Sequence, residues 1–208
     1  MGFLRRGGGY RKLQVYKLTE IIYDISYHFA NRYLTKRDRT VDQMVQASRS
    51  GKQNIAEGSL ASMTSRKTEI KLTNVAKASL GELLIDYEDY VRTRKLNRWD
   101  AKNERYKKLR EFVKTDDFES DYMQLVERLN DEEIANLCMT LIHQAIYMLD
   151  HLLDAQQEQF VNEGGVSEAM TRARLKTRNL GNNETDRRKG RTVGQTESDK
   201  NPTKSDKK

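Results

Sequence analysis

The sequence contains little of what interrupts helices or cross-links a chain. Its 208 residues include one proline, Pro202, so about 200 residues run without the strongest helix breaker, whereas all-β chains need frequent proline and glycine turns. The only cysteine, Cys138, excludes an intrachain disulfide and zinc sites built from several cysteines. These scarcities favour an all-α chain, and the apolar run around Cys138 predicts a buried thiol in a reducing cytoplasm.

Long apolar runs are also scarce. The first ten residues carry two arginines and the three-glycine run 7–9, but no stretch apolar enough for a signal peptide, and no later segment approaches a membrane span. Arg6 stands where a myristoylation signal starting at Gly2 needs Ser or Thr. We expect a cytoplasmic protein without a membrane partner, whose 36% hydrophobic residues suffice for one core of ordinary domain size.

Charge is unevenly distributed along the chain. Residues 1–115 carry 25 basic and 13 acidic side chains, residues 116–158 carry 1 and 11, and residues 164–208 carry 12 and 6. A basic region followed by an acidic one fits an anionic partner, or complementary surfaces that meet within the fold or between copies. Solvated helix faces would account for much of the same pattern.

Four long segments repeat apolar residues at helical spacing, three and four residues apart. They are residues 13–33, a segment capped by Asp38 or Thr40 that continues to Gly58, a segment from the polar break 62–65 to Arg94, and a last one from Asn130 or Asp131 to about Phe160. Gly164 and Gly165 are expected to end the last segment. Because four long helices with short links pack antiparallel, we expect an up-down-up-down four-helix bundle.

Residues 97–130, between the third and fourth long segments, are expected to form a helical insertion. Within it, the spacing predicts a basic amphipathic helix over Trp99–Lys114 and a short helix through Tyr122 and Leu129. The expected order of segments is a flexible basic N-terminus (1–11), the bundle with its insertion (12–160), a partly helical suffix (161–176) and a disordered, basic, polar tail (177–208).

The second long segment is rich in small residues between Ala47 and Gly58. Gly51 inside a helix costs roughly 1 kcal/mol relative to alanine, so we expect a closely approaching backbone to compensate. Asn54 and Glu57 lie three residues apart on one helix face. We interpret both as structural, either bonding across to the third helix or fixing the end of their own, and a binding role is the alternative.

The segment Gln46–Gly58 resembles the signature of four-helix-bundle proteins encoded in intervening sequences of bacterial 23S ribosomal RNA, a pattern of roughly R-A-A-x-S-x-x-x-N-I-A-E-G. Ser50 and residues 54–58 match this pattern directly. Residues 13–17 are similar to the opening helix of the family, and residues 75–83 are similar to its A-x-x-S-x-x-E-L run. The resemblance covers about residues 12–95, and the last long segment by its pattern.

Other parts of the chain depart from this family's core pattern. Gln46 and Gly51 stand where the family usually has arginine and an apolar residue, and the insertion 97–130 lies outside the core. Residues 160–165 and 168–175 resemble the suffix motif of a subgroup whose bundle carries a C-terminal extension.

The resemblance implies a homo-oligomer, typically a pentameric ring. Relatives that accompany diversity-generating retroelements are basic accessory proteins, and the resemblance implies the same partners here, nucleic acid and a reverse transcriptase. Because the family has no established catalytic activity, the resemblance implies no enzyme.

Basic side chains are the best candidates for function in this sequence. Those predicted to contact nucleic acid are Arg49, Lys52, Arg66, Lys67, Lys71, Arg92, Arg94, Lys95 and Arg98. Cations in the first turn of the third helix oppose its dipole by about 0.3–1 kcal/mol, so an anion is expected nearby. The family-motif residues Ser50, Asn54, Glu57 and Gly58 are predicted to be structural. In an oligomer a basic patch repeats around the symmetry axis, which multiplies its phosphate contacts.

Catalytic and metal-binding patterns are weak. His143 and His151 share a helix face, but two turns separate them by roughly 12 Å, too far for one zinc ion. No serine has a histidine placed beside it as a base, and no glycine-rich loop carries the Lys-Ser or Lys-Thr of a phosphate-binding loop. We expect no catalytic, cofactor or metal site.

These patterns favour two functions over a third. The preferred one is a non-enzymatic oligomer that binds RNA or DNA with little sequence specificity, as an accessory to a retroelement or other mobile element. The alternative is a protein-interaction scaffold whose basic 1–115 and acidic 116–158 regions dock subunits or a protein partner. An enzyme ranks last because no catalytic constellation is present.

Overall fold

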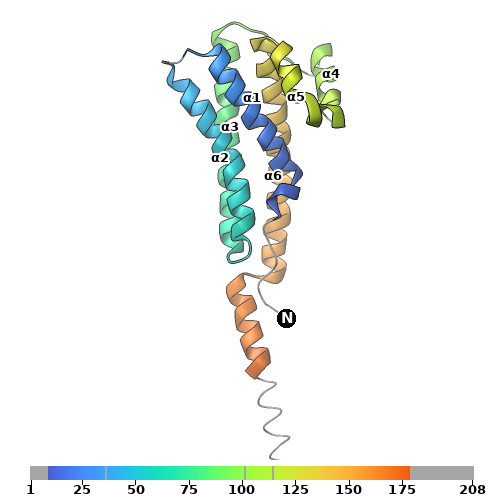
Figure 1. Ribbon diagram of the computed structural model, residues 1–208. Coiled ribbons are helices and arrows are strands. Elements are labelled where there is room, and N and C mark those ends of the chain that lie inside the picture. The colour runs from blue at the N-terminus through green and yellow to red at the C-terminus, as the bar shows by residue number, and fades with distance from the viewer. Residues whose placement is uncertain (1–8, 36, 101, 114, 179–208) are drawn as a thin grey trace, which may run out of the picture. The chain divides into compact units, whose positions relative to one another are not determined.

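The computed structural model describes residues 9–35, 37–100, 102–113 and 115–178. Within these residues the chain is all-helical and contains no strand, which confirms the predicted all-α class (Figure 1). In chain order the elements are the 3₁₀ helix η1 (Tyr10–Lys12) and the helices α1 (Gln14–Tyr33), α2 (Arg39–Ala61), α3 (Arg66–Thr93), α4 (Glu104–Phe112), α5 (Asp116–Arg128) and α6 (Asp131–Glu163). These elements belong to one compact unit, and a further helix over residues 166–178 belongs to a second.

The compact unit is built around the four long helices. Both α1 and α3 pack against α2 and α6, so every long helix contacts two others. Consecutive long helices run in opposite directions (Figure 1). Their inner faces share one core, and its largest fully buried side chains include Ile22, Phe29, Leu80, Tyr87 and Leu141. Removing this apolar surface from water stabilises the unit by roughly 25 cal/mol per Å² buried.

Side-chain caps mark the starts of three of the long helices, α2, α3 and α6. Asp38 caps α2 by accepting the backbone N–H of Thr40 at 2.9 Å, which decides between the two expected caps. Ser65 caps α3, and Asn130 caps α6 in a reciprocal capping box with Glu133. Each cap satisfies a backbone N–H that the first helical turn leaves without an intrahelical partner.

Small residues of α2 allow a close approach of α3. A Cβ atom on Gly51 would lie 2.8 Å from Leu80 Cδ2, and one on Gly58 would lie 3.3 Å from both the Glu69 carbonyl oxygen and Leu72 Cβ. The expected close packing is therefore confirmed. It offsets the helix-propensity cost of the two glycines, because a side chain at either position would force Leu80, or the backbone at Glu69, to shift.

The insertion between α3 and α6 differs in part from the predicted one. Helix α4 begins at Glu104 rather than at Trp99. The backbone N–H of Trp99 donates to Asn136 Oδ1 at 2.8 Å, and its indole N–H donates to Glu132 at 3.2 Å. Both acceptors lie on α6, so tertiary hydrogen bonds hold a segment whose apolar spacing alone predicted a helix.

Helix α5 is tied to α1 by two tyrosines. The Tyr122 hydroxyl donates to Asp24 at 2.6 Å, and the Tyr33 hydroxyl donates to the Leu129 carbonyl oxygen at 3.0 Å. Burial, together with the Asp24 carboxylate, raises the pKa of Tyr122. The second short helix of the insertion is confirmed, and it starts earlier than the predicted one, at Asp116.

The predicted terminal segments lie largely outside the described residues, which exclude 1–8 and 179–208. At the inner end of the segment predicted to be flexible (1–11), Tyr10–Lys12 forms η1 and the Tyr10 ring contacts that of Tyr16. Helix α6 extends beyond Phe160 to Glu163 and stops at Gly164, which adopts φ 70°.

The helix over residues 166–178 extends two residues into the segment predicted to be disordered. Its apolar residues Met170 and Leu175 are exposed, at 36% and 52%. Within the part of the chain that the structure describes, no helix combines the length and apolar character needed to cross a membrane.

Candidate nucleic-acid interface

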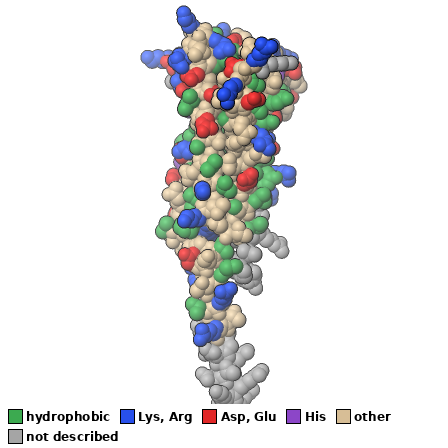
Figure 2. All heavy atoms as spheres, turned by 90° about the vertical axis from the view of Figure 1, so that its left-hand side faces the viewer, with side chains coloured by type: hydrophobic (Ala, Val, Ile, Leu, Met, Phe, Trp, Pro, Cys, Tyr) green, Lys and Arg blue, Asp and Glu red, His purple; other side chains and the backbone are tan. Residues whose placement is uncertain are grey.

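The α1–α2 turn and the end of α3 lie at the same end of the compact unit, where Lys and Arg side chains gather (Figure 2). The exposed basic residues of these two segments, which we call the α3-end cluster, are Arg37, Arg39, Arg92, Arg94 and Lys95. The two segments interact electrostatically. Hydrogen bonds from Thr40 lower the pKa of Asp38, and the nearby Arg94 guanidinium lowers it further.

Lys95 occupies the position that ends α3. Its N–H donates to the Arg92 carbonyl oxygen at 3.2 Å and the Leu96 N–H donates to the Val91 carbonyl oxygen at 2.9 Å, the bond pair of a Schellman motif. Lys95 has φ 58°, the single positive φ found among the described non-glycine residues. This left-handed conformation costs about 1–2 kcal/mol for a residue with a Cβ, and glycine is its usual occupant. A lysine here is less stable than a glycine would be, and it adds an exposed cation to the cluster.

Arg94 is oriented by a tyrosine. Its guanidinium carbon lies 3.8 Å from the ring centroid of Tyr90. The Tyr90 hydroxyl donates to Asp131 at 3.0 Å, and burial together with this bond raises the pKa of Tyr90 to about 12. Stacking on a neutral, fixed ring restricts the guanidinium and leaves its planar fork of donors available to an oxyanion.

Carboxylates neutralise part of this end of α3. Arg92 pairs with Asp89 at 2.7 Å, and Arg98 pairs with Glu88 at 2.7 Å. The other members of the α3-end cluster form no ion pair with any described residue. Exposed pairs are worth at most about 1 kcal/mol, so Arg92 and Arg98 can exchange a carboxylate for a phosphate at small cost.

Arg66 does not have the predicted role. Its side chain is 10% exposed, and its guanidinium donates to Glu163 at 2.5 Å and to the Gln159 carbonyl oxygen at 2.7 Å. These bonds join the start of α3 to the end of α6. The prediction of Arg66 as a phosphate contact is therefore wrong, and the anion expected beside this helix start is the protein's own Glu163.

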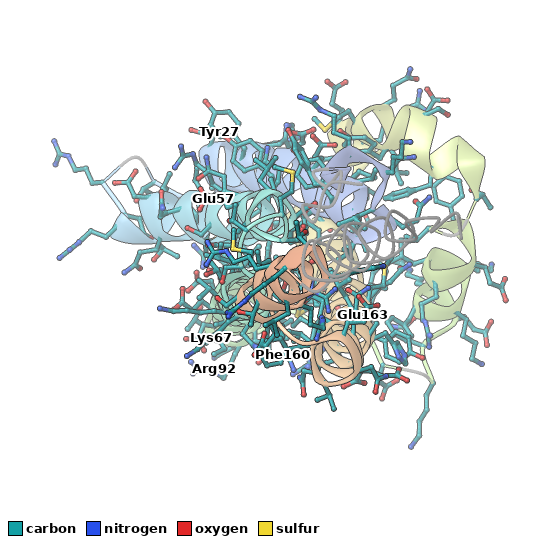
Figure 3. All side chains as sticks on the ribbon, turned by 90° about the horizontal axis from the view of Figure 1, so that it is seen from below. Tyr27, Glu57, Lys67, Arg92, Phe160 and Glu163 are labelled. Atoms are coloured by element: carbon teal, nitrogen blue, oxygen red, sulfur yellow. The ribbon has the colours of Figure 1, made fainter. Side chains whose placement is uncertain are left out.

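Lys67 and Lys71, the remaining cations at the start of α3, are exposed. Seen along the helices, Lys67 and Arg92 lie on the same side of the compact unit (Figure 3). However, 25 residues of α3 separate them, about 38 Å at 1.5 Å per residue. The structure therefore does not bring the two ends of α3 into one surface.

The predicted α2 contacts form a third group. Arg49 is exposed, and Lys52 Nζ lies 4.2 Å from the ring centroid of Tyr23 on α1. This cation–π contact holds Lys52 against α1 and away from the α3-end cluster. The nine predicted contacts thus divide into a buried arginine and three separate groups, which are exposed except for the half-buried Lys52.

The family-motif residues mostly bond within their own helix. Asn54 Nδ2 donates to the Ser50 carbonyl oxygen at 2.8 Å, and Gln46 Nε2 donates to Ser50 Oγ at 3.1 Å. The alternative that Asn54 bonds across to α3 is therefore wrong. Glu57 is exposed, and Gly58 contributes the close contact with α3.

An acidic groove of about 570 Å³ runs between α2 and α3. Its lining residues are Asp42, Gln43, Gln46, Ala47, Ser50, Glu82 and Asp86. Burial raises the pKa of Asp86, and the carboxylates of Asp89 and Glu82 add to the shift. The carboxylates of this groove therefore disfavour the binding of phosphate there.

A second groove, of about 480 Å³, lies between α4 and α6. Its lining residues are Tyr106, Arg110, Thr140, His143, Gln144, Tyr147 and Met148. Sequence reasoning missed this groove, because it depends on how α4 packs on α6, and it also missed Arg37 and Arg39, although the expected up-down-up-down order places the α1–α2 turn at the end of α3. The four-residue spacings of Tyr106 with Arg110 and of His143 with Tyr147 were the available signal.

Histidine and cysteine side chains do not assemble into a site. Within the described residues no group of three or more His, Cys, Asp or Glu side chains is arranged to hold a metal ion. His151 packs its ring edge-on against Tyr147, with centroids 4.4 Å apart. Cys138 is fully buried as predicted, and burial raises its pKa to about 12, so it is inert as a nucleophile.

Comparison of the chain with protein-family models, with curated proteins and with solved structures finds no match. Function is therefore argued from the site itself.

Proposed function

We propose that the chain is a non-enzymatic, oligomeric protein that binds RNA or DNA through the α3-end cluster. The observation that carries the proposal is the cluster itself: five exposed cations from two segments, of which Arg92 alone is paired with a described carboxylate. The strained Lys95 supports it, because a cation is kept where glycine would be more stable. Contacts of this kind go to the phosphate backbone and carry little sequence specificity.

The fold and assembly that we propose are an antiparallel up-down-up-down four-helix bundle assembled as a homo-oligomer. The packing of α1 and α3 against both α2 and α6 supports the bundle. The resemblance of residues 46–58 favours a pentamer and a reverse transcriptase as protein partner. Oligomerisation would repeat the α3-end cluster around the symmetry axis, and the salt dependence of binding would grow with the number of phosphates contacted.

A protein-interaction scaffold is the second candidate. The acidic α2–α3 groove favours it, because the carboxylates of Asp42, Glu82 and Asp86 attract a basic protein surface and repel the phosphates of a nucleic acid. In this reading the α3-end cluster docks on an acidic protein surface, and nucleic acid binds no better than to any protein of net charge +7.

The two ends of α3 provide a matched test. We expect Arg94→Glu with Lys95→Glu to weaken binding of labelled RNA, single-stranded DNA and duplex DNA at least about tenfold at 0.1 M salt, and to lower the salt slope. Lys67→Glu with Lys71→Glu makes the same charge change on the same helix and should cost less than about threefold. Fluorescence anisotropy over a salt series measures both, and light scattering reports the mass.

Equal losses in the two variants would show that net charge, and not the α3-end cluster, controls binding. If the unmodified chain binds no better than a control protein of equal charge, and the Arg94→Glu, Lys95→Glu variant changes the measured mass, the scaffold replaces the nucleic-acid reading.

A further inference from the structure

The α4–α6 groove differs chemically from the α2–α3 groove and from a groove on α1. The seven residues that line it include two tyrosines, a histidine and an arginine, and none of them is acidic. By contrast, the α2–α3 groove carries three carboxylates, and a groove lined by Tyr23, Tyr27 and Arg32 also contains Asp24. Phosphate is therefore least opposed in the α4–α6 groove.

One tyrosine ring of this groove is highly exposed, and the other, that of Tyr106, is half-buried. Tyr147 is 64% exposed, the largest exposed fraction of any described aromatic side chain, and it touches the His151 ring edge-on. Across the groove, Tyr106 lies on α4 with the Arg110 guanidinium carbon 5.7 Å from its ring centroid. Aromatic rings and guanidinium planes are the groups on which unpaired bases stack.

Helix α4, which supplies Tyr106 and Arg110 to the groove, is rich in basic residues. The helix carries Arg105, Lys107, Lys108 and Arg110. Arg105 lies 3.5 Å from Glu133, and Lys107 lies 3.1 Å from Glu104. Lys108 and Arg110 are exposed and form no ion pair with a described residue. Of these two, Arg110 lines the groove, and an unpaired cation beside stacking rings matches a strand in which phosphates alternate with bases.

We propose that the α4–α6 groove binds single-stranded nucleic acid, with unpaired bases stacked on Tyr147 and Tyr106 and a flanking phosphate on Arg110. This inference rests on the proposed nucleic-acid function and deepens it by naming the strand state. A duplex cannot use the groove in the same way, because its base faces are already stacked on their neighbours. The volume of about 480 Å³ is in the range of pockets that enclose small ring systems.

Tyr147 and Tyr27 allow a matched test in the full chain, because both are exposed, at 64% and 54%, and each lines a different groove. Stacking contributes about 5- to 150-fold per base. We therefore expect Tyr147→Ala to weaken binding of unstructured RNA and DNA strands of about 12 nucleotides at least about fivefold. Binding of a duplex of equal length should change less than about twofold, and Tyr147→Trp should restore single-strand binding.

The outcomes separate this inference from the function on which it rests. A Tyr147→Ala loss no larger than that of Tyr27→Ala, or an equal loss for duplex, overturns the stacking site. If Arg94→Glu with Lys95→Glu still weakens every nucleic acid, the proposed function survives that failure. If the unmodified chain binds neither strands nor duplex above a control of equal charge, both proposals fail. Protection of Tyr147 by a hydrophobic protein segment, without single-strand binding, would assign the groove to a protein partner instead.

Discussion

The two ends of α3 both carry basic side chains, and the fold uses them differently. At the start, Arg66 is buried against Glu163 and the Gln159 carbonyl oxygen, near the C-terminal end of α6, where the helix dipole favours a cation. At the other end, Arg94 and Lys95 are exposed, and the α1–α2 turn adds further cations. Whether a cation of α3 is structural or available to a ligand therefore depends on the element packed beside it and not on the residue type.

The largest expected effect concerns the start of α3, where Arg66 is buried. Arg66→Ala should lower the free energy of unfolding by about 1–3 kcal/mol, because two acceptors on α6 lose a charged donor. The adjacent Lys67→Ala should change it by less than about 0.5 kcal/mol. Urea denaturation followed by circular dichroism measures both. Similar stability of the two variants would mean that the Arg66 bonds contribute nothing net.

A smaller effect on stability is expected at the C-terminal end of α3, at Lys95. Lys95→Gly should raise the free energy of unfolding by about 1 kcal/mol, because glycine adopts the φ of 58° without the Cβ penalty. The same change should weaken nucleic-acid binding and lower the salt slope by about one. Lys95→Ala is the control, since it removes the cation and keeps the strain. A stability gain in Lys95→Ala as large as that in Lys95→Gly would contradict the conformational explanation.

The smallest effect concerns the acidic stretch that separates the two ends. Because burial and the neighbouring carboxylates raise the pKa of Asp86, the folded chain binds a proton there more tightly than the unfolded chain does. Stability therefore rises as pH falls through the raised pKa, and the ionised form is unfavourable at neutral pH. We expect Asp86→Asn to gain less than about 1 kcal/mol at pH 7.

This gain should disappear below pH 3.8, the ordinary pKa of an aspartate side chain. Denaturation midpoints compared across pH test the expectation. A gain that does not vary with pH would attribute the effect of Asp86→Asn to packing and not to ionisation.

Features that depend on nearby residues were predicted most closely. Apolar spacing predicted α1 to within a residue of its bounds, and Asn130 with Glu133 forms the capping box that starts α6. Errors occurred where distant residues intervene. Trp99 bonds to α6 instead of joining α4.

In the candidate site, too, local features were predicted and contacts between distant residues were not. The sequence indicated that the end of α3 is basic, and Arg94 and Lys95 lie there, exposed. It did not indicate that α6 would bury Arg66, whereas the expected up-down-up-down order already places the α1–α2 turn, with Arg37 and Arg39, at that end. No local pattern distinguishes Arg66 from Lys67, because the difference arises from Glu163, 97 residues away.

Helix class, the starts and ends of the long helices and the glycine-rich face of α2 are properties of local chemistry, because apolar period, caps and backbone propensity act within a few residues. The separation of structural from exposed cations, and the α4–α6 groove with Tyr106 and Tyr147, depend on tertiary structure. They exist only after helices distant in sequence pack together, because burial and ion pairing are set by whichever atoms the fold brings within a few ångströms.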